Sequence, residues 1–409
     1  MGIELDWVVL AILVAFIVYS LLTNAVDRSL ITLPIIFMCL GFLVSDPLNA
    51  AAPPEVLNEG KRLLAEITLV LVLFSDASRV QFSKLRQDWA LPFRMLLIGL
   101  PLSIGIGTIV TLLVNPAGGI AMALLTAAVL SPTDAALGLP VVASPEVPER
   151  LRETINVESG LNDGLVLPFV VLGATLAAAG GSVAQTDGLA LSALSQIVLG
   201  PLAGISVGWL VAKGMDFAQS RDLTAEAAEG VVFLATAFAA YVAAQVIGGN
   251  GFIAAFVAGM VFGNTYRNDI RFVHEFMEGA GQLLTMSAFL VFGALLLPDG
   301  LAHVTPRAML IAVLFLTVVR MGSIWLSLTG SGLPSREKLF LGWFGPRGLA
   351  SILFTLVVMD EFDIPGEAEL LSCVSMTVAL SILAHGLSAT PLASRIGRSG
   401  QSGDAGKTD

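Results

Sequence analysis

Charged residues are scarce in this chain of 409 residues, of which they make up only 13%. Soluble globular proteins contain about 25% charged residues. A chain of this length with so few charges cannot cover a water-facing surface. The composition therefore excludes a soluble enzyme, a nucleic-acid-binding protein and a disordered protein.

Cysteine and histidine are also rare. The two cysteines, Cys39 and Cys373, both lie in apolar runs and predict neither a disulfide framework nor a zinc site. The three histidines, His274, His303 and His385, are too scattered for a histidine-based metal centre. Of these, His385 lies at membrane depth, where we expect a packed, hydrogen-bonded side chain rather than a pH sensor. We expect no cofactor.

Apolar residues make up 56% of the chain and occur in long runs. A membrane-spanning helix needs about 20 mainly apolar residues. Segments of this kind number thirteen: 7–23, 29–45, 61–79, 91–114, 117–143, 155–180, 190–215, 228–247, 250–264, 280–298, 306–329, 337–359 and 368–390. The sequence therefore predicts an all-α protein that crosses a lipid bilayer about thirteen times.

Basic residues are unevenly distributed between the loops of this topology. With the N-terminus outside, the inner loops and the tail hold 16 of the 21 basic residues, and the outer loops hold only Lys61, Arg62 and Arg307. The other two, Arg320 and Arg347, lie within spans. Basic loops favour the cytoplasmic side, so we expect a cell-membrane protein with an external N-terminus and a cytoplasmic C-terminus.

Two spans contain helix breakers beside ionisable residues. The fifth span contains Ser131-Pro132-Thr133-Asp134, and the twelfth contains Gly345-Pro346-Arg347-Gly348. A proline lacks a backbone donor and frees a carbonyl, which must find a partner inside a membrane. These motifs predict two discontinuous helices, whose end charges Asp134 and Arg347 are placed to balance. The alternative is a pair of proline kinks used only for packing.

The positions of the breaks also predict symmetry. Five and twelve differ by seven, an odd number, so spans 1–6 and 8–13 must be inverted if they are repeats. Inverted repeats with interrupted helices are typical of secondary transporters that bind substrate at the membrane midplane.

Ionisable residues inside the predicted spans are few. They are Asp76, Asp134, Glu158, Asp163, Arg320 and Arg347. A charge at the bilayer centre costs about 2.5–3.5 kcal/mol or more, so each needs a partner or a function. Four acids against two bases leave two acids without a basic partner. A carboxylate that can hold either a proton or a hard cation is the basis of an exchanger.

The sixth span carries two polar pairs at i, i+4 spacing. Ser159 and Asp163 share one face and can offer a hydroxyl and a carboxylate to one ion. Glu158 and Asn162 form the second pair. We expect Glu158 to form an ion pair with an arginine, and the residues alone leave Arg320 and Arg347 both open. The alternative role for the Asn-Asp pair is contact between helices.

Together these motifs resemble the NhaP-type sodium/proton antiporters of the cation/proton antiporter superfamily. The motifs are Ser131-Pro-Thr-Asp134, Glu158-Ser-Gly-Leu-Asn-Asp163 and Gly345-Pro-Arg-Gly348. Their order, spacing and span positions match over nearly the whole chain. The resemblance implies thirteen helices in two inverted six-helix repeats, with two discontinuous helices that cross. One departure is Ala135, which replaces the usual proline after Thr-Asp.

The resemblance also implies roles for the site residues. Asp163 would bind the ion and the proton, and Ser159 and the Thr133 main chain would be further ligands. Asn162 would hydrogen-bond Asp134 at the crossing. The family pairing falls on Glu158 and Arg320, with Arg347 at the break beside Asp134. On the third span, Asp76 would be a further ligand, or else an interfacial acid paired with Arg79.

The implied domains are a mobile core of helices at about 91–180 and 306–390 and a dimer-forming domain at about 7–79 and 228–298. A linker helix lies at about 190–215, and a disordered tail spans 394–409. The implied function is exchange of Na⁺ or Li⁺ for H⁺ by a homodimer, electroneutral because electrogenic relatives have an aspartate in place of Asn162. Exchange of K⁺ for H⁺ is the alternative.

Three other functional classes fit the sequence less well. A channel would need a continuous polar stripe or a carbonyl filter, whereas the polar residues here cluster in one place. An intramembrane hydrolase would have to use His385. A sensor would need an output domain. We therefore expect a transporter and not an enzyme.

Overall fold

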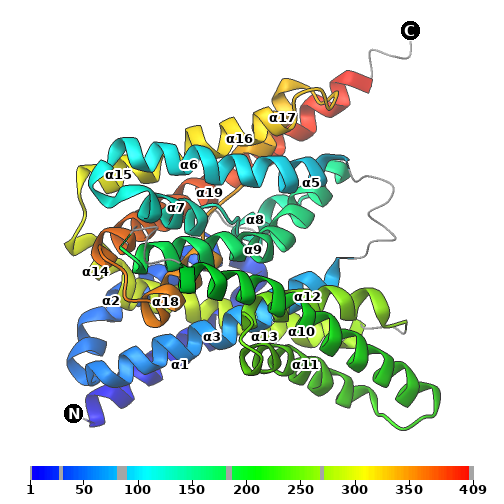
Figure 1. The fold of residues 1–409 in the computed structure, drawn as a ribbon. Coiled ribbons are helices and arrows are strands. Elements are labelled where there is room, and N and C mark those ends of the chain that lie inside the picture. Colours follow the sequence, from blue (N-terminus) through cyan, green and yellow to red (C-terminus); the bar gives the residue numbers. More distant parts are fainter. Residues whose placement is uncertain (1, 27–30, 81–89, 181–186, 268–270, 405–409) are drawn as a thin grey trace.

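The computed structural model describes residues 2–26, 31–80, 90–180, 187–267 and 271–404. All regular secondary structure in these ranges is helical (Figure 1). Four of the basic residues assigned above to the inner loops and the tail, Arg28, Lys84, Arg86 and Lys407, lie outside the described residues.

The helices follow the predicted spans. The first six spans are α1 (Gly2–Val26), α2 (Leu33–Ala51), α3 (Pro54–Arg79), α5–η1–α6 (Ala90–Arg94, Met95–Gly99, Leu100–Val114), α7–α8 (Gly119–Leu130, Ala135–Val142) and α9 (Glu149–Ala178). The seventh to ninth are α10 (Asp187–Ser220), α11 (Glu226–Val246) and α12 (Gly251–Thr265). The last four are α13–η4–α14 (Arg271–Val291, Phe292–Leu296, Leu297–Ala302), α15–η5–α16 (Pro306–Leu314, Phe315–Val319, Arg320–Ser327), α17–α18 (Ser335–Trp343, Leu349–Glu361) and α19 (Glu367–Asp404).

Within the described residues, nine helices are long and apolar enough on their own to cross a membrane. The remaining four predicted spans are the more polar α3, the short α12 and the two broken helices α7–α8 and α17–α18. The predicted all-α, multi-pass fold class with two discontinuous helices is therefore confirmed.

The helices run side by side in one general direction, in two groups with α7, α8 and α9 between them (Figure 1). One group contains α3, α10, α11 and α12, in which α12 packs on α3 and α10. The other contains α6, α15, α16 and α19, in which α19 packs on α15. α1 begins at one end of the bundle and α19 ends at the other. The division into a mobile core and a dimer-forming domain stays a prediction.

The last helix is longer than the sequence indicated. The predicted disordered tail begins at residue 394, whereas α19 continues to Asp404. Two of the residues near this boundary, Ala393 and Ile396, are buried in a cluster with Leu328 and Phe340. Their apolar contacts carry the helix past the end of the predicted span.

Close packing of α12 on α3 positions the middle of the bundle. A Cβ at Gly259 would overlap the backbone of Phe74, and a Cβ at Gly263 would overlap that of Ser78. Small residues that let two backbones approach are the usual means of packing helices in membranes. This contact holds the segment of α3 that carries Asp76 beside the broken helices.

Candidate functional site

The first break separates α7 from α8. α7 ends at Leu130, and the missing donor of Pro132 prevents the helix from continuing. Asp134 is the N-cap of α8: its Oδ1 accepts hydrogen bonds from the backbone N–H groups of Ala136 at 2.8 Å and Leu137 at 3.4 Å. Such caps satisfy the free donors of a helix start. Pro132 thus breaks the helix two residues before the cap, and Ala135 becomes the first residue of α8.

The second break meets the first at the same carboxylate. α17 ends at Trp343 and α18 begins at Leu349, whose N–H donates to Asp134 Oδ2 at 2.6 Å. The N–H of Asp134 in turn donates to the carbonyl of Pro346 at 2.8 Å. One carboxylate therefore caps two half-helices, each of which carries partial positive charge at its N-terminus.

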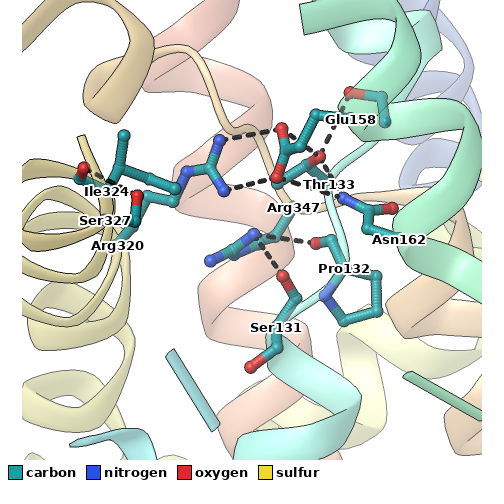
Figure 2. Close-up of polar contacts among 10 residues, drawn as sticks. Ser131, Pro132, Thr133, Glu158, Asn162, Arg320, Ile324, Ser327 and Arg347 are labelled. Atoms are coloured by element: carbon teal, nitrogen blue, oxygen red, sulfur yellow. Dashed lines mark hydrogen bonds and ion pairs between the residues drawn. The ribbon is translucent and has the colours of Figure 1, made fainter. Parts of the chain in front are cut away.

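Arg347 lies at the other side of the first break, at the C-terminal end of α7. Its Nη1 donates to the carbonyl oxygens of Ser131 at 2.7 Å and Pro132 at 2.9 Å, just beyond the C-terminus of α7 (Figure 2). The residue is fully buried, with 0% of its surface exposed. These hydrogen bonds place Asp134 and Arg347 at the ends of the broken helices that they are predicted to balance. The guanidinium contacts its helix end through freed carbonyls and not through an ion pair with Asp134.

The glycines of the second break are required by close approach. A Cβ at Gly348 would overlap Asp134 Oδ2, and a Cβ at Gly345 would overlap Arg320 Nε. The Gly-Pro-Arg-Gly motif therefore admits one carboxylate and one guanidinium against its backbone. This explains why both glycines flank the Pro-Arg pair.

Glu158 forms a buried, two-pronged ion pair with Arg320 (Figure 2). Arg320 Nη1 lies 2.7 Å from Oε1, Nη2 lies 3.0 Å from Oε2, and both side chains are 3% exposed. Arg320 follows the π-helical segment η5 directly, and such segments are frequent at functional sites. The structure thus selects Arg320 and not Arg347 as the partner of Glu158.

Thr133 joins this ion pair to α9 through a network of hydroxyl contacts. Its Oγ1 lies 3.2 Å from Glu158 Oε2 and 3.1 Å from Ser159 Oγ, and it accepts a hydrogen bond from Asn162 Nδ2. Asn162 Nδ2 also lies 3.5 Å from Glu158 Oε1. The expected hydrogen bond from Asn162 to Asp134 is wrong, because the Asn162 amide donates to Thr133 and lies against Glu158 instead.

A cavity of about 1120 Å³ leads to this network. Asp76, Asp134, Ser159 and Asp163 lie on its wall, and the exposed residues Arg79 and Arg150 line its outer part. Ser159 and Asp163, predicted to share one face of the helix, thus lie on the same cavity wall. Thr133 contacts this wall through Ser159, and Asn162, Glu158, Arg320 and Arg347 are not among the residues that line it.

At the opposite end of the bundle, Arg62 and Glu66 of α3 face Leu356 and Glu361 of α18 across a gap too small to hold a water molecule. The large cavity opens at the other end, at which α3 finishes, beside the exposed residues Arg79 and Arg150.

Asp163 has a buried oxygen that makes no hydrogen bond. Its Oδ1 has no partner in the part of the chain that the structure describes. Asp76 lies on the same cavity wall, and the ion pairs among the described residues do not join it to Arg79. The carboxylates of Asp76 and Asp163 and the hydroxyl of Ser159 thus line the cavity beside Asp134, whose own oxygens cap the two half-helices.

Some contacts of the site could not be found from motifs. The backbone N–H of Leu349 and the hydroxyl of Ser381, which accepts from the Arg347 N–H at 2.6 Å, carry no motif of their own. The one sequence signal from which Ser381 could have been found is its i, i+4 spacing to His385 in the last span. Tyr19 and Thr23 of α1, which line the cavity, gave no signal.

An all-helical membrane protein with two broken helices that cross at buried charges belongs, by fold and site, to the secondary transporters. Residues 7–395 match the family model described as "Sodium/hydrogen exchanger, transmembrane". The chain belongs to this family.

Curated relatives carry two different ion names. A K(+)/H(+) antiporter NhaP2 of Shewanella oneidensis is 26% identical over 271 residues, which are 66% of this chain and 46% of that protein. An Na(+)/H(+) antiporter ApNhaP of Aphanothece halophytica is 27% identical over 362 residues, 84% of this chain and 66% of that protein. The match to NhaP2 thus spans about half of the length of that relative.

The fold matches solved antiporter structures. The structure of the sodium proton antiporter MjNhaP1 from Methanocaldococcus jannaschii at pH 8 superposes with a TM-score of 0.75 at 19% identity, covering 96% of this chain and 99% of that one. An electron-microscopy structure of MjNhaP1 gives a TM-score of 0.77 at 18% identity. At these identities, the similarity establishes the fold.

Proposed function

We propose that this protein exchanges Na⁺ or Li⁺ for H⁺ across the cell membrane, with the two ions competing for Asp163. The observation that carries the proposal is the unpartnered Asp163 Oδ1 at the inner end of the cavity. A buried carboxylate oxygen needs a hydrogen-bond or charge partner. A proton and a hard cation are the two partners that exchange requires it to hold in turn.

The neighbouring oxygens supply further ligands. A hydroxyl has one hydrogen and two lone pairs. Thr133 directs its hydrogen to Glu158 and accepts from Asn162, so the contact with Ser159 uses the hydrogen of Ser159. The lone pairs of Ser159 then remain for a cation beside Asp163. In the described structure, the Thr133 carbonyl, unlike those of Ser131 and Pro132, accepts no assigned hydrogen bond and is the proposed main-chain ligand.

The fixed charges of the site cancel. Asp134 and Glu158 carry two negative charges, and Arg320 and Arg347 carry two positive charges, all buried and hydrogen-bonded. Asp163 is then the charge that each transported ion neutralises, so one cation moves against one proton without net charge. Asp76 also lines the cavity and can serve as a further ligand. If Asp76 releases a second proton in each cycle, the ratio of protons to cations rises above one.

The proposed orientation follows the loop charges. The cavity opens at the end that carries Arg79 and Arg150, which the distribution of basic residues assigns to the cytoplasm. The structure is then an inward-facing state of an alternating-access cycle, with α1–α3 and α11–α14 as the dimer-forming domain of a homodimer. Single cysteines at Ala225 and His303, introduced after replacing Cys39 and Cys373 by serine, should label from inside and outside respectively.

Ion identity is tested in everted membrane vesicles. Recovery of the fluorescence of a pH-sensitive dye after addition of NaCl, LiCl or KCl reports exchange of each cation for protons. We expect responses to sodium and lithium. A response to potassium alone would establish K⁺/H⁺ exchange, which the name of the Shewanella relative supports.

Electroneutrality is tested on a solid-supported membrane with purified protein in proteoliposomes. The expected result is exchange by the dye assay without a sustained sodium-driven current. A sustained current in the wild type that disappears in Asp76→Asn would show that Asp76 carries a second proton.

A further inference from the structure

His385 is a buried side chain that the proposed ion site does not use. It lies in α19 with 1% of its surface exposed. Its Nε2 is 2.9 Å from the carbonyl oxygen of Trp343, the last residue of α17 before the break. Its Nδ1 is 3.2 Å from the hydroxyl of Ser381 and 2.9 Å from the carbonyl of that residue. The imidazole therefore contacts the break in the second discontinuous helix.

Neighbouring residues on the same face of α19 contact the two sides of this break. The backbone N–H of Arg347, on the far side, donates to Ser381 Oγ at 2.6 Å. The indole Nε1 of Trp343, on the near side, donates to Ser388 Oγ at 2.9 Å. Ser381, His385 and Ser388 have i, i+4, i+7 spacing and share one helix face. This face of α19 spans the break from Trp343 to Arg347.

Each ring nitrogen of His385 lies 2.9 Å from a carbonyl oxygen: Nε2 from that of Trp343 and Nδ1 from that of Ser381. Ser381 accepts from Arg347, so its own hydrogen is available to an unprotonated Nδ1 of His385. With its proton on Nε2, the imidazole accepts from the Ser381 hydroxyl and donates to the Trp343 carbonyl.

We propose that His385 is a positioning residue for the ion site, with its Nε2–H holding the carbonyl end of α17. Together with Ser381 it sets the shape of the break and hence the position of Arg347. The Arg347 guanidinium donates to the carbonyls of Ser131 and Pro132, directly before the ligand residue Thr133. The hydrogen bonds thus run from α19 through both breaks to the cation ligands.

The tautomer is measured without reference to transport. The chain has three histidines, so ¹⁵N-histidine labelling of the purified full-length protein should yield three ring systems. The His385→Gln variant identifies the signals of His385. We expect a protonated Nε2 and an unprotonated Nδ1 at neutral pH. A proton on Nδ1 with an unprotonated Nε2 would overturn the proposal.

The transport measurement rests on the proposed function and compares two substitutions. In His385→Gln the amide can still donate to the Trp343 carbonyl, whereas His385→Leu leaves that carbonyl without this donor. We expect His385→Leu to raise the apparent KM for sodium about tenfold, with a smaller change in maximal rate, because a buried hydrogen bond that positions the ligands is lost. His385→Gln should stay within about twofold of the wild type, since its donor is kept.

Ser388→Ala is the matched control, because it removes the contact of the Trp343 indole and leaves His385 in place. Its apparent KM should equal that of the wild type. An unchanged KM in His385→Leu, an equal rise in His385→Gln, or an equal rise in Ser388→Ala would each overturn the positioning role. The nitrogen spectrum gives its answer whether or not the protein exchanges ions, so failure of exchange and failure of the role of His385 are distinguishable.

Discussion

The carboxylate of Asp134 accepts a hydrogen bond from the backbone N–H of Leu349 at 2.6 Å, across 215 positions of the sequence. The same carboxylate caps α8 through Ala136 and Leu137. Two half-helices from opposite halves of the chain thus end on one side chain. A change at Asp134 should therefore affect the N-termini of both α8 and α18.

Replacement of Asp134 by asparagine should therefore destabilise the fold. Both carboxylate oxygens accept N–H groups, and an amide would turn an NH₂ group toward one of them. A buried donor left unpaired costs about 1–3 kcal/mol. The thermal unfolding temperature of the purified Asp134→Asn variant should fall clearly below that of the wild type, and an unchanged temperature would contradict the double cap.

Asp163→Asn should instead leave the fold stable and abolish exchange. The Oδ1 of Asp163 makes no hydrogen bond within the described structure, so Asp163→Asn removes a buried charge without breaking a bond at that oxygen, and the free energy of unfolding should not fall. Exchange should be abolished, because a neutral amide holds neither the proton nor the balancing charge for a cation. Residual exchange in a folded Asp163→Asn protein would show that another group carries the ions.

Acidification should act as competition at Asp163. If a proton and a cation share this carboxylate, lowering the pH on the cation side should raise the apparent KM for sodium and leave the maximal rate unchanged. Initial rates in proteoliposomes at several sodium concentrations, between about pH 8 and about pH 6, measure this. A fall in maximal rate at constant KM would instead indicate a proton that acts elsewhere.

Breaking the ion pair between Glu158 and Arg320 should be costly. Glu158→Gln leaves a buried guanidinium without its charge partner, and such a loss typically costs about 3–5 kcal/mol. Removal of both charges in Glu158→Gln/Arg320→Met should recover part of this stability. A double-mutant cycle of unfolding free energies isolates the pair; additive effects would show that the two residues do not interact.

Gly348→Ala should disturb the crossing without any change of charge. The added Cβ would overlap the Asp134 carboxylate, and overpacking of a filled interior costs about 1–3 kcal/mol. Gly322→Ala in α16 is the control, because a Cβ at that position meets no other atom within 4 Å. We expect loss of stability and exchange in the first variant, and neither in the second.

Local chemistry allowed the breaks to be predicted, and long-range contacts did not follow from it. Pro132 and Pro346 mark the breaks because proline cannot continue the backbone ladder. Helical spacing placed Ser159 and Asp163 on one face. Spacing does not say which atoms a face meets. The Asn162–Asp134 bond, expected from the family resemblance, was wrong, and Asn162 donates to Thr133 instead. The length of α19 was missed because Ala393 and Ile396 gain their burial from residues far away in sequence.

The size of the cavity bears on the speed of ion entry. At about 30 Å³ per water molecule, a volume of about 1120 Å³ holds tens of waters, so a sodium ion can arrive beside Asp163 with much of its hydration shell intact. Dehydration is then confined to the last step, where oxygens of the protein replace those of water. In the proposed alternating-access cycle, entry from this side should then be fast compared with the movement that carries the bound ion across.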